Sequence, residues 1–290
     1  MQNLNDVFHY FKSIQMKQAT AVLLAESRRS PDAAPFPPRK IYDEFQVAHR
    51  FYDHRPAFWI TPEQPSMRVL YLHGGAYYNE CVPAHWSLIK RLCRKLNAEV
   101  VVPDYPLTPV YGYRDVFSMV TQVYRDCLAD IPHGQLVLAG DSAGGGIALA
   151  LCQWAKLEME RTPSKLVLIS PWLDITLRDP EIKELDKVDP FLESESLRQM
   201  GVWYCQGDNP MFYQVSPLFG NLEGLPPSIV FTGTRDILNS DARRFAYQAQ
   251  KVNSPITLWE EQGMIHTWML FPIEEAQTAL KAMEQFLQDC

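Results

Sequence analysis

The chain has 290 residues, of which 47% are hydrophobic and 21% are charged, the balance of a globular protein that buries a sizeable core. This composition excludes a disordered chain, a collagen-like fibre and a coiled coil. Acidic side chains outnumber basic ones by 34 to 27, which makes nucleic acid and anionic membrane surfaces poor candidate partners.

A helix-prone segment comes first along the chain, and a series of short apolar strands follows it. Residues 1–30 favour helix, and the proline-rich stretch from Pro31 to Pro38 ends this segment. Eight apolar runs then predict strands near Phe45–Tyr52, Ala57–Thr61, Arg68–Leu72, Glu99–Val102, Gln135–Ala139, Lys165–Ile169, Ser228–Phe231 and Ile256–Glu260. Helical patterns lie between and after these strands, at 85–96, 115–129, 143–158, 240–252 and 274–288.

The alternation of strands and helices predicts an α/β fold, with a mostly parallel eight-stranded sheet flanked by helices. Ligands of such sheets lie outside the carboxyl ends of the strands. One segment, residues 178–215, interrupts the alternation because it has no strand pattern and carries many aromatic side chains near its end. We interpret it as a helical insertion over the edge of the sheet; the alternative is an extra helical layer without a functional role.

The cysteines and the apolar runs indicate where the protein resides. Single cysteines stand at 81, 93, 127, 152, 205 and 290, and none forms a C-x-x-C pair or lies at metal-ligand spacing with a histidine. We therefore predict free thiols, a reducing compartment and no metal. No apolar run approaches the ~18–20 residues of a membrane span, so we expect a cytoplasmic protein without membrane insertion.

The sharpest motif is Gly140-Asp-Ser-Ala-Gly144, which fits G-x-S-x-G between a predicted strand and a predicted helix. This is the context of a nucleophile elbow, a strained turn that projects the serine oxygen at a helix N-terminus. A glycine-rich phosphate loop is the main alternative, but the lysine–serine/threonine pair of a P-loop is missing. Ser142 is therefore the predicted nucleophile.

A serine nucleophile needs a base, and the base needs an orienting carboxylate that follows the serine along this kind of chain. His266 is the only histidine after Ser142, and it comes after the last predicted strand. Asp236 follows the preceding strand and is the favoured acid. Asp174 also follows a strand and stays open as an alternative, and two weaker candidates are Asp208 and Asp241.

A glycine-containing loop, His73-Gly-Gly-Ala-Tyr77, follows the strand Arg68–Leu72. Its backbone N–H groups could bind the oxyanion of a tetrahedral intermediate, since Gly74 and Gly75 allow close approach to a substrate. A plain tight turn is the alternative. His73 itself is expected to support this loop rather than to act as a base.

Together these motifs resemble the hormone-sensitive-lipase-like branch of the α/β-hydrolases, which includes bacterial carboxylesterases and acetyl esterases. The resemblance spans roughly residues 65–275. It rests on HGGAY at 73–77, PDYPLTP at 103–109, GDSAGGG at 140–146, SPWLD at 170–174, SPL at 216–218, TGTRDIL at 232–238 and GMIHTW at 263–268.

The resemblance implies roles for particular residues. The nucleophile, acid and base correspond to Ser142, Asp236 and His266. The oxyanion donors correspond to the N–H groups of Gly75, Ala76 and Ala143. One α/β-hydrolase domain is implied over residues 1–290, with a helical cap built from about 1–45 and the insertion at about 178–215.

Two departures from the family pattern stand out. The family loop usually reads HGGG, whereas Ala76 holds its last position here, and its methyl group is expected to narrow the acyl site or to shift the N–H. Val110 replaces the acidic residue that usually closes the DYxLxPE-like segment, which removes a supporting contact.

The predicted activity is hydrolysis of short acyl esters, acetyl to butyryl, by a serine esterase that needs no cofactor. Bulky side chains are expected to line the substrate pocket and to crowd a long chain: Tyr77, Trp172 and Ile265, with Tyr78 and the aromatics of 203–213 nearby. An amidase or peptidase with the same triad is the alternative, followed by a ligand-binding protein on this fold. The expected partner is a small ester, and a homo-oligomer is left open.

Overall fold

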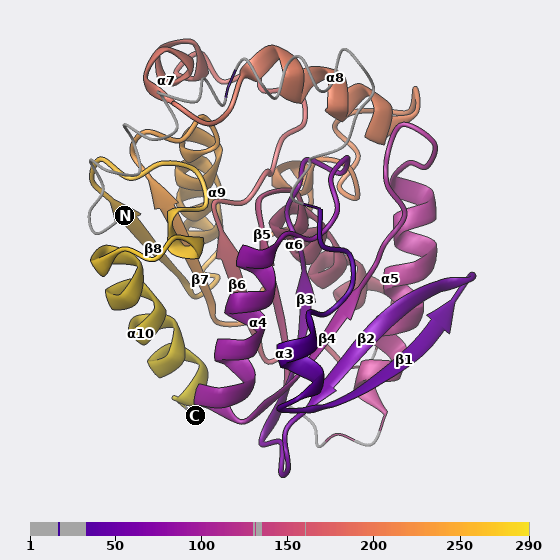
Figure 1. The fold of residues 1–290 in the computed structure, drawn as a ribbon. Helices are drawn as coiled ribbons and strands as arrows, with labels where there is room; N and C mark the ends of the chain where they lie inside the picture. The colour runs from indigo at the N-terminus through magenta and orange to yellow at the C-terminus, as the bar shows by residue number, and fades with distance from the viewer. Residues whose placement is uncertain (1–16, 18–32, 130, 132–134, 160, 290) are drawn as a thin grey trace.

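The fold is described from a computed structural model that covers residue 17 and the ranges 33–129, 131, 135–159 and 161–289. A single twisted sheet runs through the middle of the molecule, with helices in front of it and behind it (Figure 1). Its order is β1-β2-β4-β3-β5-β6-β7-β8. The bounds of the strands are β1 Gln46–Tyr52, β2 Arg55–Thr61, β3 Met67–Leu72, β4 Ala98–Pro103, β5 Leu136–Asp141, β6 Lys165–Ile169, β7 Ser228–Gly233 and β8 Ile256–Glu261.

The pairing of the strands is antiparallel at one end of the sheet and parallel elsewhere. β2 pairs with β1 and β4 in antiparallel register. The pairs from β4 through β3, β5, β6 and β7 to β8 are all parallel. Parallel strands place their carboxyl ends at one edge, so the loops after β3, β5, β7 and β8 meet there.

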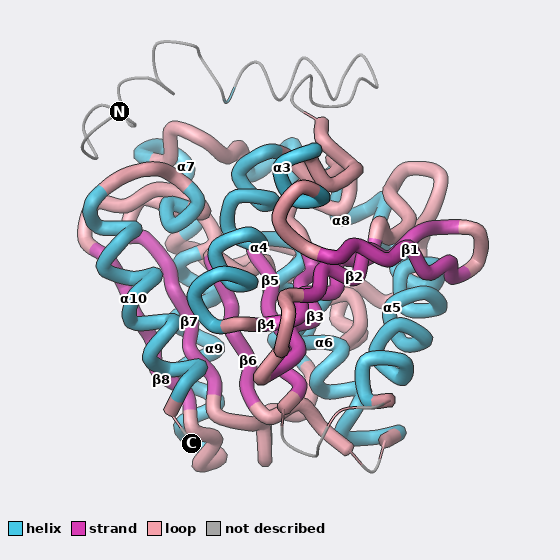
Figure 2. The backbone as a smooth tube through the Cα atoms, turned by 60° about the horizontal axis from the view of Figure 1, so that its bottom comes forward, coloured by secondary structure: helices cyan, strands magenta, loops and turns pink. Residues whose placement is uncertain are grey.

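The helices form a layer on each face of the sheet (Figure 2). Buried side chains of α4 and α10 share one apolar cluster with α3 and η2, whereas those of α5, α6 and α9 belong to the cluster on the other face. The bounds are α3 Arg39–Tyr42, α4 Pro83–Leu96, α5 Tyr113–Leu128, α6 Ser142–Glu158, α7 Ile182–Val188, α8 Ser194–Cys205, η1 Pro217–Phe219, α9 Asn239–Lys251, η2 Trp268–Leu270 and α10 Glu274–Gln288.

The central strands are apolar on both faces because both faces are covered. In β3, Leu70 and Leu72 pack into one cluster, whereas Val69 and Tyr71 pack into the other. This is the side-to-side alternation of a strand, and a strand buried on both sides reads as a continuous apolar run. The sequence pattern therefore locates these strands well.

The predicted α/β architecture is confirmed, with eight strands in a mostly parallel sheet. Residues 178–215, predicted to be a helical insertion, contain α7 and α8. In Figure 1 these two helices lie above the carboxyl ends of the central strands. The predicted helix over residues 1–30 lies almost wholly outside the described residues. Of those that are described, Lys17 bonds the Asp186 carboxylate on α7 at 2.6 Å.

Two further expectations concern the cysteines and membranes. The five cysteines within the described ranges are buried free thiols, at positions 81, 93, 127, 152 and 205. No helix among the described residues is long and apolar enough to cross a membrane.

Candidate active site

Ser142 lies at a sharp turn between β5 and α6. Its φ angle is +51°, in the left-handed region that a serine rarely adopts. A side chain on Gly144 would come closer than 3.0 Å to the carbonyl oxygens of Leu72 and His73. The glycine thus lets the start of α6 pack directly against the end of β3, and the turn holds Ser142 at the helix N-terminus.

Three side chains that are distant in the sequence meet at this turn. His266 Nε2 lies 2.9 Å from Ser142 Oγ. His266 Nδ1 lies 2.9 Å from Asp236 Oδ2. Because an ionised carboxylate only accepts, Nδ1–H donates to Asp236 and Nε2 is left to accept the serine proton. Asp236 follows β7 and His266 follows β8, so neighbouring parallel strands bring the two loops together.

The other aspartates considered as the acid are bonded elsewhere. Asp174 caps its own turn through the N–H and hydroxyl of Thr176. Asp208 accepts from Tyr113, and Asp241 pairs with an arginine on its own helix. The geometry therefore brings Asp236, rather than any of these three, to the histidine.

The loop after β3 turns its backbone sharply beside Ser142. Gly75, Ala76 and Tyr77 have φ angles of +122°, +54° and +58°. Among the described residues, no protein acceptor bonds the N–H of Gly75 or Ala76. Ala143 is at the start of α6, where the first N–H groups have no partner within the helix. These three groups are thus free to bind an oxyanion.

A buried carboxylate ties this loop to the nucleophile turn. Asp141, the residue before Ser142, accepts from the Tyr71 hydroxyl at 2.6 Å and from the Gly74 N–H at 2.9 Å. Its other oxygen lies 3.2 Å from His85 Nε2. Burial opposes the charged form of Asp141, but these partners outweigh it and hold the pKa below its ordinary value. One ionised side chain therefore positions both the loop and the turn.

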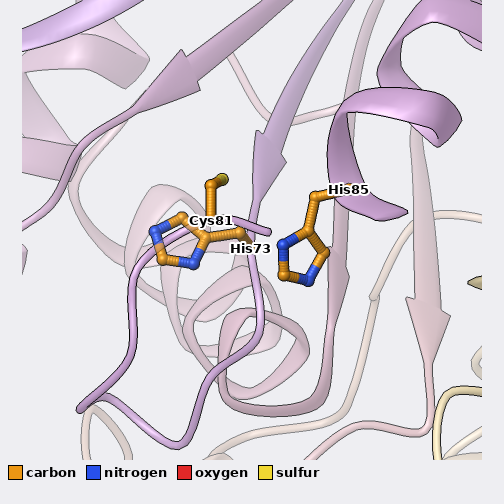
Figure 3. Close-up of side chains that lie close together, drawn as sticks. All are labelled: His73, Cys81 and His85. Atoms are coloured by element: carbon orange, nitrogen blue, oxygen red, sulfur yellow. The ribbon is translucent and has the colours of Figure 1, made fainter. Parts of the chain in front are cut away.

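His73, Cys81 and His85 lie close together (Figure 3), and His85 joins this group to the Asp141 carboxylate. Their ligand atoms lie within 4.8 Å of one another, and all three residues are buried. His85 Nδ1 accepts from the Val82 N–H at 3.0 Å, and its Nε2 faces Asp141, so both ring nitrogens are engaged. Burial, together with the charge of Asp141, raises the pKa of the Cys81 thiol well above its ordinary value. The two histidines support the loop through hydrogen bonds, His73 to the Gly74 carbonyl and His85 to Asp141.

His73 is held neutral within this support. Its ring stacks on Tyr105 with centroids 4.4 Å apart, and the Tyr105 hydroxyl donates to the His73 carbonyl at 2.6 Å. Burial, aided by the neighbouring His85, lowers the pKa of His73 to about 4. A neutral, stacked imidazole supports the loop, and the hydrogen-bond partner of Ser142 is His266 instead.

The electrostatics of His266 favour its charged form. Burial disfavours the imidazolium, but the carboxylates of Asp236, Asp189 and Asp141 outweigh burial and raise the pKa of His266 above its ordinary value. The site therefore stabilises the imidazolium that forms when the serine proton is taken.

The residues expected in the substrate pocket separate into two groups. Tyr77 stacks on Trp172 with centroids 5.2 Å apart and on Tyr204 of α8 with centroids 3.7 Å apart. Ile265 instead packs with Met264 in the cluster on the opposite face of the sheet. The structure thus joins Tyr77 and Trp172 but does not bring Ile265 to them.

Three residues that sequence reasoning overlooked contribute to the site: Asp141, His85 and Asp189. Asp141 had a visible signal, a charged residue two positions after the apolar run 135–139, whereas the other two have none along the chain. Val110, which replaces an acidic family residue, is 73% exposed, and nothing in the structure explains the replacement.

Comparisons with known proteins agree with this geometry. Residues 69–270 match the model of a family described as having the alpha/beta hydrolase fold. The chain is 31% identical over 239 residues to an acetyl-hydrolase of Streptomyces hygroscopicus, covering 81% of this chain and 80% of the relative. It is 29% identical over 290 residues to an esterase of Acinetobacter venetianus, covering 92% and 94%.

Comparison with solved structures also finds esterases of this fold. The fold superposes with a TM-score of 0.82 on an esterase from the bacterial hormone-sensitive lipase family, at 25% identity and covering 98% of this chain and 97% of the other. With a serine, a histidine and an aspartate in hydrogen-bond contact at its elbow, the chain belongs to the hormone-sensitive-lipase-like α/β-hydrolases and is a carboxylic-ester hydrolase.

Proposed function

We propose that this protein hydrolyses short-chain acyl esters, acetyl to butyryl, through an acyl-enzyme on Ser142. The observation that supports this most is the continuous line of hydrogen bonds from Asp236 through His266 to Ser142. A serine in this line, at the N-terminus of α6, is an activated nucleophile. No step of the reaction calls on a cofactor.

The first half of the reaction forms the acyl-enzyme. His266 Nε2 takes the hydroxyl proton while Ser142 Oγ bonds to the ester carbonyl carbon. Asp236 holds the imidazole in the correct tautomer and stabilises its charge. The tetrahedral intermediate then collapses, the bond to the alcohol oxygen breaks, and that oxygen takes the proton from His266 as the alcohol leaves.

The oxyanion of the intermediate binds to the N–H groups of Gly75, Ala76 and Ala143. Donors held in place before the reaction stabilise charge without reorganisation, and loss of one costs ~10²–10³ in rate. Water then attacks the acyl-enzyme with His266 as the base, which releases the carboxylic acid and restores Ser142.

The preference for short acyl chains is supported by the stacked aromatic side chains at and beside the loop after β3. Tyr77, Trp172 and Tyr204 stack face to face and are each less than 2% exposed. A rigid stack of this kind limits the length of chain that can lie next to Ser142. The methyl group of Ala76 narrows the space further. The relative from Streptomyces is called an acetyl-hydrolase, which agrees with a small acyl group.

Residues 178–215 and the N-terminal segment, about residues 1–45, together form a cap in this proposal, on one α/β-hydrolase domain over residues 1–290. Lys17 supports this arrangement, because its Nζ bonds both the Asp186 carboxylate and the Asp186 carbonyl on α7. A cap of two segments covers the site and shields the reaction from bulk water.

The test is turnover of p-nitrophenyl esters with acyl chains of two to twelve carbons. We expect kcat/KM to be highest between acetate and butyrate and to fall steeply beyond. A preference for octanoate or longer chains would rule out the short-chain assignment. Ser142→Ala should abolish both turnover and labelling by a fluorophosphonate, and faster cleavage of anilides than of matched esters would indicate an amidase instead.

A further inference from the structure

Asp189 is a buried carboxylate next to the triad, and it belongs to the insertion rather than to the sheet. It directly follows α7 and is 3% exposed. Its Oδ1 accepts the N–H groups of Phe191 and Leu192 at 2.7 and 2.9 Å. Its Oδ2 accepts the N–H of Ile237 at 2.9 Å. One oxygen therefore binds the insertion's own turn, and the other binds the loop after β7.

The Ile237 N–H is part of the turn that carries Asp236. The Asp236 N–H donates to the Gly233 carbonyl, and Asp236 Oδ1 accepts the Leu238 N–H at 2.9 Å. The contact with Asp189 occupies the N–H between these two. With all three groups bonded, the backbone of the turn has little freedom, and Asp236 Oδ2 is held toward the imidazole.

The same stretch of the insertion also contacts the imidazole. The ring of Phe191 lies 5.7 Å from the ring of His266, centroid to centroid. The insertion thus reaches both members of the Asp236–His266 pair, through Asp189 on one side and Phe191 on the other.

A carboxylate that served only its own turn would leave its second oxygen in water. Asp189 instead buries both oxygens beside another carboxylate, and burial together with Asp236 raises the pKa of Asp189 to about 7. Three backbone N–H donors offset this unfavourable placement. A role confined to the insertion does not account for the contact with Ile237.

We propose that Asp189 is a positioning residue. Through it the insertion, residues 178–215, holds the Asp236 turn in place and adds a second negative charge near His266. This inference rests on the proposed triad. It links the packing of residues 178–215 against the sheet to the correct placement of Asp236, because the Asp189 side chain takes part in both.

The negative charge of Asp189 raises the pKa of His266. The groups that face His266 are Asp236 from the loop after β7, Asp189 from the insertion, Asp141 from the end of β5 and the uncharged ring of Phe191. Asp189, with a pKa of about 7, is ionised mainly in the upper part of this pH range, and there its carboxylate stabilises the imidazolium. Removing this charge lets the base lose its proton at a lower pH. The acid limb of the rate profile then moves to lower pH.

The experiment compares Asp189→Asn with wild type on p-nitrophenyl acetate from pH 5 to 9. We expect kcat to fall about 10- to 100-fold, as for a small displacement of a catalytic group, with KM nearly unchanged and the acid limb shifted to lower pH. Asp186→Asn is the matched control, because Asp186 bonds Ser194 and Lys17 and, within the described part of the chain, none of its bonds reaches the Asp236 turn. Its acid limb should stay in place.

A normal kcat and an unmoved acid limb in Asp189→Asn would overturn the proposal. A lower kcat with an unmoved limb would do the same, since it indicates a purely structural role. If the asparagine variant does not fold, Asp189→Ser applies the same test, because a serine hydroxyl can still cap the turn but lacks the charge. Ser142→Ala is measured alongside: activity in that variant refutes the triad itself, whereas its inactivity beside a wild-type-like Asp189→Asn refutes only the positioning role.

Discussion

At the scale of single residues, Ser142, His266 and Asp236 form a chain of hydrogen bonds, and the charged groups around them set the pKa of the histidine. Burial alone would make His266 a poor acceptor of a proton. The carboxylates around it raise the pKa of His266 by more than burial lowers it, so a fully buried imidazole can still act as the base. The same burial holds His73 neutral at a pKa of about 4. The pKa values of two buried histidines, both near carboxylates, are therefore shifted in opposite directions because of their immediate partners.

The assignment of the acid gives the first prediction. Asp236→Asn should lower kcat about 10⁴-fold, as expected for loss of a triad acid that fixes the tautomer. Asp174→Asn is the matched control, since the Asp174 side chain bonds Thr176 and not the histidine, and its effect on kcat should be small. Steady-state kinetics on p-nitrophenyl acetate measures both, and a larger loss in Asp174→Asn would make our choice of acid wrong.

The raised pKa of His266 gives a second prediction, on the pH dependence of the rate. His266 must be neutral to act as the base, so kcat/KM falls as the pH drops through its pKa. Because Asp236, Asp189 and Asp141 outweigh the effect of burial, the midpoint of this acid limb should lie above 6.5, the ordinary value for histidine. Rates of p-nitrophenyl acetate hydrolysis between pH 5 and 9 measure it. A midpoint at or below 6.5 contradicts the effect of the carboxylates.

At the scale of elements, the site depends on how closely α6 approaches β3. The close approach needs a glycine at 144, where any side chain meets the backbone of Leu72 and His73. The loop at residues 73–77, proposed to bind the oxyanion, follows the same strand. The distance between nucleophile and loop is thus fixed by the packing of a helix on a strand rather than by the loop alone.

The third prediction tests this contact. Gly144→Ala should lower the free energy of unfolding by about 3 kcal/mol, at the upper end of overpacking costs, and should reduce kcat as the elbow moves. Gly207→Ala is the control: its φ is +83°, and an added Cβ meets nothing within 4 Å. It should cost only the backbone strain of about 1–2 kcal/mol, with kcat unchanged. Urea unfolding and kinetics compare the two, and equal losses in both would remove the steric argument.

The insertion is the second element that matters at this scale. Tyr204 on α8 stacks on Tyr77, and Asp189 after α7 bonds Ile237. The insertion thus contacts both the loop after β3 and the loop after β7. The alternative of a helical layer without a functional role is hard to reconcile with contacts to both sides of the site.

At the scale of the whole molecule, the sheet places its functional loops at one edge and fills the space behind them with apolar side chains. This leaves little room for charge in the interior. Asp241 on α9 is fully buried, and its Oδ2 has no hydrogen-bond partner among the described residues. Burial, together with Asp174, raises the pKa of Asp241 from 3.8 to about 7.

That shift gives a fourth prediction, on stability. A carboxyl group whose pKa is raised on folding stabilises the protein at low pH, and this contribution is lost as the pH rises from about 4 through 7. Asp241→Asn keeps an oxygen for Arg244 but carries no charge, so it should raise the free energy of unfolding at pH 8 by about 1–3 kcal/mol. The difference from wild type should vanish near pH 4. Urea titrations at both values measure it, and a variant less stable than wild type at pH 8 would contradict the buried charge.

Much of this protein follows from signals that are local in the chain. Buried parallel strands read as apolar runs, the elbow reads as glycines around Ser142, and His266 is the only histidine that follows the serine. Each signal depends on a few neighbouring residues and on backbone geometry. For this reason the strands, the fold class, the nucleophile and the base could all be predicted without coordinates.

Only the tertiary structure decided which distant side chains share a space. Four aspartates remained as candidates for the acid along the chain, and the adjacency of β7 and β8 selected Asp236. The contact between Asp189 and Ile237 joins residues 48 positions apart, and no local pattern indicates it. Ile265 is next to the base in sequence, yet it packs on the other face of the sheet from Tyr77 and Trp172. The physical reason is the same in each case: strand order and helix packing set distances in space, and these depend on the whole fold at once.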